Sequence, residues 1–77
     1  MRKPAGKMFR VLYIYQMLCD KKVVKLGRLA AEFHASKRTL QRDIDDVKAF
    51  FADAGVIDGH YEEVVYDRKL EGYRLVA

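Results

Sequence analysis

Hydrogen-bond donors are concentrated in the short stretch that begins at Ser36. Arg side chains make paired hydrogen bonds to guanine edges, and hydroxyl and Lys groups bind phosphate oxygens. We therefore expect this stretch to contact duplex DNA, because DNA offers both phosphates and base edges. The residues concerned are Ser36, Lys37, Arg38, Thr39, Gln41 and Arg42.

The same stretch has the spacing of an α-helix with two different faces. At about 100° per residue, Arg38 and Arg42 fall almost opposite an apolar stripe. Ser36 is a good N-cap, and Gly55 is placed to end the helix in a left-handed conformation. We expect this helix to run from Ser36 to about Ala52. The stripe that packs it on the core is Leu40, Ile44, Val47 and Phe51.

Further basic residues lie outside this helix. Three candidates for phosphate contacts precede the second helix, Lys21, Lys22 and Lys25, and the tip of a predicted hairpin carries two more basic residues, Arg68 and Lys69. A solvated charged loop is the alternative for all five. The same tip also holds two acids, so its net charge is small.

Carboxylates within the predicted helix oppose contact with phosphates. Asp43 should point sideways into the domain, where Arg10 or Arg28 could pair with it. Asp45 could orient a neighbouring donor, Arg42 or Gln41.

Apolar residues cover most of the segment from Met8 to Cys19. One stripe at helical spacing predicts a helix, and its opposite side is largely apolar too. In so small a domain a helix of this kind suggests a partner surface, for a second subunit or for a further effector domain. The stripe comprises Met8, Val11, Leu12, Tyr15, Leu18 and Cys19, and the opposite side Phe9, Tyr13, Ile14 and Met17.

The remaining elements complete an α+β pattern. Val23-Val24 suits one short strand, and residues 26–33 a helix of about two turns, followed by the turn His34-Ala35. Residues 56–60 are expected to form a loop, and residues 61–66 and 73–76 the strands of a hairpin. Three helices, a short strand and a C-terminal hairpin are the order of a winged helix-turn-helix. We expect one domain over residues 1–77, with the helix-turn-helix at about 26–52 and the wing at about 61–76.

Charge and cysteine content agree with a nucleic-acid-binding class. Residues 1–48 hold 12 Lys and Arg against 5 Asp and Glu, whereas residues 49–77 hold 3 against 6, within a net charge of +4. Such segregation favours one basic face. A lone cysteine and the absence of a long apolar stretch favour a cytoplasmic protein without membrane contact.

Catalysis is not expected. Cys19, His34 and His60 are the only thiol and imidazoles, and their spacing builds neither a metal site nor a nucleophile. Cys19 should be a core thiol because it lies on the apolar stripe. We expect no cofactor and no metal.

Residues 29–47 (LAAEFHASKRTLQRDIDDV) resemble the helix-turn-helix of DeoR-type bacterial repressors. They are most similar to the N-terminal domain of WYL-domain transcriptional regulators, whose pattern is L-A-x-x-F-x-V-S-x-R-T-[IL]-x-R-D-[IL]. Residues 65–69 and 72–75 resemble that group's second hairpin, so the likeness covers about residues 8–76. The resemblance implies sequence-specific, nucleoid-associated DNA binding in a bacterial transcription regulator, through Arg38, Thr39 and Arg42.

Two departures from the pattern stand out. His34-Ala35 replaces the usual Gly-Val, which removes a permissive backbone position, and the chain stops at Ala77 without an effector domain. The chain is thus either a fragment of a longer regulator or a small free-standing one. The alternative function is a winged-helix module that binds protein or RNA.

Overall fold

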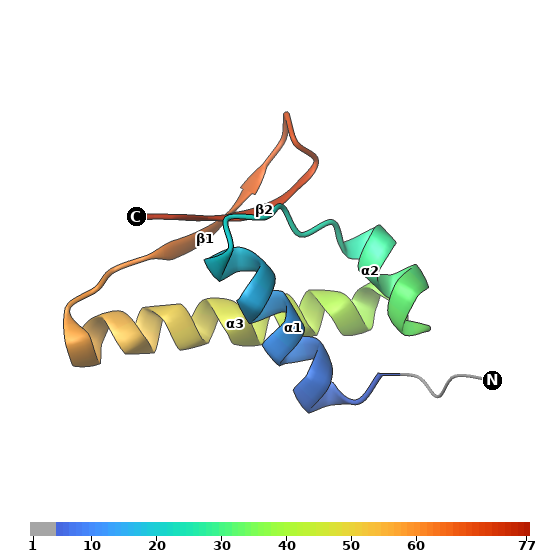
Figure 1. The fold of residues 1–77 in the computed structure, drawn as a ribbon, viewed down its shortest axis with the longest axis horizontal. Helices are drawn as coiled ribbons and strands as arrows, with labels where there is room; N and C mark the ends of the chain where they lie inside the picture. The colour runs from blue at the N-terminus through green and yellow to red at the C-terminus, as the bar shows by residue number, and fades with distance from the viewer. Residues whose placement is uncertain (1–4) are drawn as a thin grey trace.

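The computed structural model describes residues 5–77. Three helices precede a two-stranded antiparallel hairpin, which makes this a small α+β domain (Figure 1). The elements are α1 (Lys7–Cys19), α2 (Leu26–Phe33), α3 (Lys37–Asp58), β1 (Glu63–Asp67) and β2 (Gly72–Val76).

Helix α3 is the element on which the others assemble. In Figure 1, α1 crosses in front of α3 near its middle, α2 lies by its first turns, and the hairpin lies along one side. Its expected stripe is confirmed, since all four of its residues are buried. They meet apolar side chains of every other element in a single core. The core comprises Ile14, Leu18, Val24, Leu29, Ala30, Phe33, Leu40, Ile44, Val47, Phe51, Val64 and Leu75.

The start of α3 agrees with the sequence, but its end does not. The Ser36 hydroxyl caps the helix by accepting from the Thr39 N–H at 3.1 Å. Helix α3 then continues through Gly55 to Asp58, and Gly59 (φ 78°) is the left-handed residue that ends it. The expected cap at Gly55 and the expected loop from residue 56 are therefore wrong. The ring of Tyr61 lies where a Cβ of Gly55 would be. The absence of a side chain at Gly55 therefore lets Tyr61 pack closely against α3.

The expected core stripe of α1 was only partly right. Ile14 and Leu18 are fully buried, although Ile14 had been placed on the opposite side. Met8, Leu12 and Cys19 are exposed, so Cys19 is not a core thiol. The periodicity alone could not choose between two apolar faces, because both have helical spacing.

The hairpin is anchored to the rest of the chain by backbone contacts. Val24 and Tyr73 exchange two hydrogen bonds of 2.8 Å, so the expected short strand is a single bridge. A Cβ on Gly72 would lie 2.5 Å from Val23 Cγ1 and 2.8 Å from the Val24 carbonyl oxygen. Glycine thus lets β2 approach residues 23–25 closely. Within the hairpin, Val64 faces Leu75 across the strands, and both are buried over α3.

Candidate nucleic-acid interface

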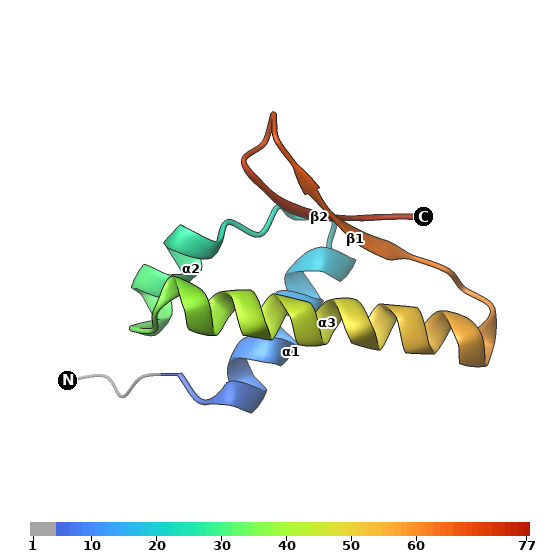
Figure 2. The ribbon, with the colours of Figure 1, turned by 180° about the vertical axis from the view of Figure 1, so that it is seen from behind.

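The two arginines predicted to contact bases both lie on the exposed side of α3. Arg38 and Arg42 are exposed, whereas Leu40, which lies between them in the sequence, and Ile44, which follows them, are buried. Figure 2 shows α3 in front of α1, with no other element drawn across the side of α3 that is turned to the viewer. Within the described residues neither guanidinium forms an ion pair. Both groups are available to an external acceptor.

Two of the acidic residues of α3 are paired with cations of α1. Asp43 is fully buried and accepts from Arg10 Nε at 2.6 Å and from Lys7 Nζ at 2.8 Å. Lys7 also reaches Asp46 at 2.6 Å. Arg10 is therefore the partner of Asp43, and the alternative, Arg28, lies 3.8 Å from Glu32 instead. Of the three carboxylates that follow Arg42, only that of Asp45 has no cationic partner in the described chain.

The same cluster shifts the pKa values of Asp43 and Lys7. Burial alone would raise the pKa of Asp43, but hydrogen bonds from Arg10 and Lys7 outweigh burial and lower it. The Asp43 and Asp46 carboxylates raise the pKa of Lys7. Asp43 and Lys7 are thus both charged near neutral pH, and the carboxylates of Asp43 and Asp46 are directed toward α1.

A groove runs between the start of α2, the start of α3 and the hairpin. It brings together four of the nine predicted site residues, namely Lys25, Lys37, Gln41 and Arg68. The stem of Lys37 packs over Gly27, where an added Cβ would lie 3.1 Å from Lys37 Cε. The other five predicted residues, Ser36, Arg38, Thr39, Arg42 and Lys69, do not line the groove.

Gln41 joins α3 to the hairpin. Its side-chain oxygen accepts from the Tyr73 hydroxyl at 3.3 Å, and its Nε2 donates to Asp45 at 3.2 Å. The expectation that Asp45 orients Gln41 is confirmed. Lys48 lies 5.2 Å from the centre of the Tyr73 ring, on the same flank. These contacts fix the hairpin relative to the exposed side of α3.

The hairpin tip is more basic than its composition indicates. The Asp67 carboxylate turns inward, where it accepts from the backbone of Lys69 and Leu70 and from Arg74 Nε at 2.9 Å. The Leu70 N–H and then Arg74 lower the pKa of Asp67. Arg68 and Lys69 remain exposed, and neither has an ion-pair partner among residues 5–77.

Seven of the residues that line the groove were not predicted as site residues, among them Arg28, Tyr66, Tyr73 and the acidic Glu71. Arg28 follows Lys25 by three residues, which places both on one side of the start of α2, so helical spacing could have found it. The two tyrosines lie opposite each other in the hairpin, with ring centres 5.2 Å apart. Their place depends on strand register, which the sequence did not specify.

Across residues 5–77, no three His, Cys, Asp or Glu side chains are grouped so that they could hold a metal ion. No helix in that range is long and apolar enough to cross a membrane. Comparison of the chain with protein-family models, curated proteins and solved structures gave no match.

Proposed function

We propose that the chain is a winged helix-turn-helix domain that binds duplex DNA sequence-specifically, as the non-catalytic DNA-binding part of a bacterial transcription regulator of the DeoR type. Helices α2 and α3 would form the helix-turn-helix and the β1–β2 hairpin the wing. The observation that carries the proposal is the exposed pair Arg38 and Arg42 on the side of α3 opposite its buried stripe.

In this arrangement α3 enters the major groove with its first turns. Arg38 and Arg42 lie one helical turn apart, so they can reach neighbouring base pairs, and Arg binds guanine O6 and N7 with two hydrogen bonds. Thr39 retains a hydroxyl proton as donor, because Ser36 Oγ donates to Thr39 Oγ1 at 3.0 Å. Base specificity is therefore assigned to Arg38, Arg42 and Thr39.

Phosphate contacts are assigned to the basic residues on either side of α3. Lys25 and Lys37 line the groove next to its start, and Arg68 and Lys69 occupy the hairpin tip. Cations in such positions set the register of a protein on the duplex without reading its sequence. Turning Asp43 and Asp46 toward Lys7 and Arg10 removes two carboxylates that would otherwise repel phosphates.

Titration of a labelled random-sequence duplex at two salt concentrations tests the binding class. About four phosphate contacts should weaken binding roughly 100-fold between 50 and 200 mM salt, because bound counterions are released. Lys25→Ala should lower the salt slope by about 0.9. Lys21→Ala is the control with the same charge change, since Lys21 lies 3.8 Å from Glu62, outside the groove. Absence of duplex binding at low salt, or binding insensitive to salt, would contradict the proposal.

A further inference from the structure

The side-chain amide of Gln41 is held on two sides by other side chains. Its Oε1 accepts from the Tyr73 hydroxyl at 3.3 Å, and its Nε2 donates to the Asp45 carboxylate at 3.2 Å. A carboxylate accepts hydrogen bonds and does not donate them, so the amide nitrogen must face Asp45. The amide oxygen then faces Tyr73, whose hydroxyl must be the donor. The two partners together fix which way round the amide lies.

The Tyr73 hydroxyl is itself held in place by the hairpin. The backbone of Tyr73 exchanges two hydrogen bonds of 2.8 Å with Val24. Its ring packs edge-on against that of Tyr66, at 5.2 Å between centres, and Lys48 Nζ lies 5.2 Å from its centre. Gln41 is therefore anchored to the hairpin as well as to its own helix.

These contacts leave part of the Gln41 amide free. A side-chain amide has two N–H donors and an oxygen with two lone pairs, and each partner uses one of them. Tyr73 and Asp45 form no hydrogen bond with each other within residues 5–77, which indicates that they approach the amide from its two outer sides. The remaining N–H and lone pair then lie side by side. Gln41 is only partly buried and lines the groove, so both are open to a ligand.

A donor beside an acceptor is complementary to the edge of adenine. In the major groove adenine offers its N6 amino group as donor beside the N7 acceptor, whereas guanine offers two acceptors. Gln41 follows Arg38 by three residues, so the two side chains are neighbours on α3 and can reach adjacent base pairs. We propose that Gln41 reads adenine in the major groove and that Tyr73 is the positioning residue that acts through it. This inference rests on the proposed DNA binding.

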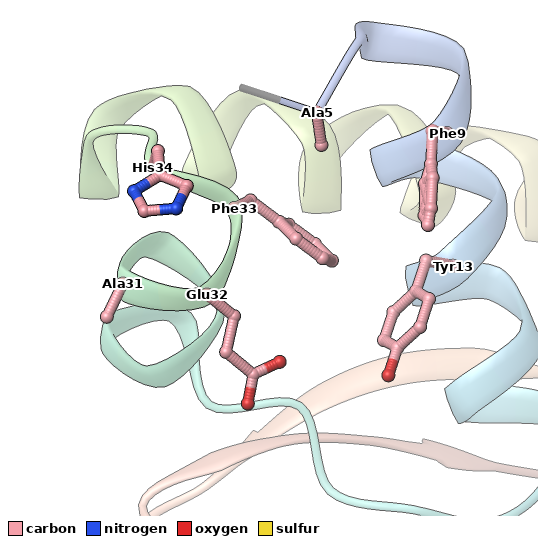
Figure 3. Close-up of a pocket in the computed structure, with 7 residues that line it drawn as sticks. All are labelled: Ala5, Phe9, Tyr13, Ala31, Glu32, Phe33 and His34. Atoms are coloured by element: carbon pink, nitrogen blue, oxygen red, sulfur yellow. The ribbon is translucent and has the colours of Figure 1, made fainter. Parts of the chain in front are cut away.

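The charge around Gln41 favours the approach of a duplex. Figure 3 shows a different hollow, between α1 and the end of α2, where aromatic rings lie with the carboxylate of Glu32. None of the described residues that line that hollow is Lys or Arg. The groove beside Gln41 instead holds four cations and one carboxylate, namely Lys25, Arg28, Lys37, Arg68 and Glu71. The free edge of Gln41 thus lies where a polyanion is attracted.

Nuclear magnetic resonance of the free chain tests the positioning without DNA. Gln16 and Gln41 are the two glutamines of a sequence that has no asparagine, so they supply all of its side-chain NH₂ groups. Gln16 is the internal control, because its Nε2 also donates to an aspartate four residues ahead, at 3.5 Å, but no Tyr bonds its oxygen within residues 5–77. The order parameter of the Gln41 amide should exceed that of Gln16. In Tyr73→Phe it should fall to the level of Gln16, which should not change.

Selection from a random duplex pool tests the base contact. The wild type should prefer adenine at one base pair beside the pair that Arg38 reads. Gln41→Ala should lower that preference roughly 10-fold or more, because two hydrogen bonds to the base are lost. Tyr73→Phe keeps the ring and should lower it about 2- to 10-fold, because a free side chain must then be ordered on binding. Tyr66→Phe is the matched control, since it removes the hydroxyl across the hairpin that does not bond Gln41, and should keep the preference.

An amide of Gln41 that is as mobile as that of Gln16 in the wild type, or that is unchanged by Tyr73→Phe, would overturn the positioning role. A motif in which Gln41→Ala alters no adenine preference would overturn the base contact and leave the proposed function standing. Equal weakening of all sequences by Gln41→Ala would also overturn it, because a phosphate contact behaves in that way. A wild type that enriches no motif would contradict the proposed function and the adenine contact together.

Discussion

Arg10 in α1 and Asp43 in α3 form an ion pair of 2.6 Å in which the carboxylate is completely buried. The Arg10 guanidinium also donates to the Ala5 carbonyl oxygen at 2.6 Å, and Lys7 supplies the second cation to Asp43. The pair is the polar connection between α1 and the helix that carries the proposed DNA contacts. It fixes the rotation of α3, because Asp43 can be buried only when Arg38 and Arg42 are turned away from α1.

Asp43→Asn should lower the free energy of unfolding by about 3 kcal/mol, because the variant leaves Arg10 without its counter-charge in a mostly buried position. Asp46→Asn makes the same charge change on the same helix. Asp46 is 58% exposed and, among residues 5–77, pairs only with Lys7, so its replacement should cost less than about 1 kcal/mol. Urea unfolding at neutral pH measures both. Equal losses of unfolding free energy in the two variants would show that the burial of Asp43 does not add to the contribution of its ion pair.

The same pair predicts how stability depends on pH. The folded protein lowers the pKa of Asp43 from its ordinary value of 3.8, so the unfolded chain takes up the proton first as the pH falls. The contribution of the pair should be complete above about pH 5 and should be lost as the pH drops from about 4 through the folded-state pKa. Unfolding followed from pH 7 to 2 should show a shallower acid loss for Asp43→Asn than for the wild type. Parallel curves would contradict the assignment.

The buried stripe of α3 should dominate the stability of the domain. Leu40 and Ile44 are fully buried, so Leu40→Ala and Ile44→Ala should each cost about 2–5 kcal/mol. Ile57→Ala removes the same atoms as Ile44→Ala from an exposed position and should change stability by less than about 0.5 kcal/mol. Thermal melting followed by circular dichroism compares the three. An unchanged melting temperature for Ile44→Ala would mean that α3 is rotated.

The turn between α2 and α3 should be strained at His34. Its backbone is left-handed, with φ 53° and ψ 44°, a conformation that disfavours any side chain with a Cβ. His34→Gly should therefore stabilise the domain by about 1 kcal/mol. His34→Ala keeps the Cβ and should give no such gain. A gain that is equal in both variants would trace to the imidazole rather than to the backbone.

Two glycines should respond differently to replacement by alanine. Gly72→Ala places a Cβ against the Val24 carbonyl oxygen and Val23, so it should cost about 1–3 kcal/mol by pushing β2 outward. Gly55→Ala meets the exposed ring of Tyr61, which can turn aside, and gains helix propensity. Its net effect should lie within about 0.5 kcal/mol. A large loss at Gly55 would mean that the Tyr61 ring cannot turn aside.

Periodicity and capping chemistry predicted α2, the start of α3 and its buried face. These features are local, because the Ser36 hydroxyl bonds three residues ahead and a helical stripe repeats every turn. The sequence left two possible partners for Asp43, Arg10 and Arg28. The packing of α1 on α3 places Arg10 next to Asp43 and so identifies it as the partner. The end of α3 was misjudged because two glycines could cap it, and Tyr61 packing on Gly55 is a tertiary contact.

The parts of the candidate site that escaped prediction depend on contacts between distant segments. The groove forms because Val24 bridges Tyr73, which brings the start of α2 next to the hairpin. No spacing within one segment encodes that approach. The inward turn of Asp67 likewise requires Arg74 across the hairpin, so composition alone underestimated the charge of the tip.

Selection of bound duplexes from a random pool, with Arg38→Ala and Arg42→Ala alongside the wild type, tests the central claim most directly. The wild type should enrich a defined motif, and each variant should lose discrimination at its own base pair by about 1–3 kcal/mol. Lys69→Ala should keep the motif and only weaken binding to all sequences. If the wild type enriches no motif, or if both arginine variants, still folded, select the same motif as the wild type, then α3 does not read DNA through its exposed side.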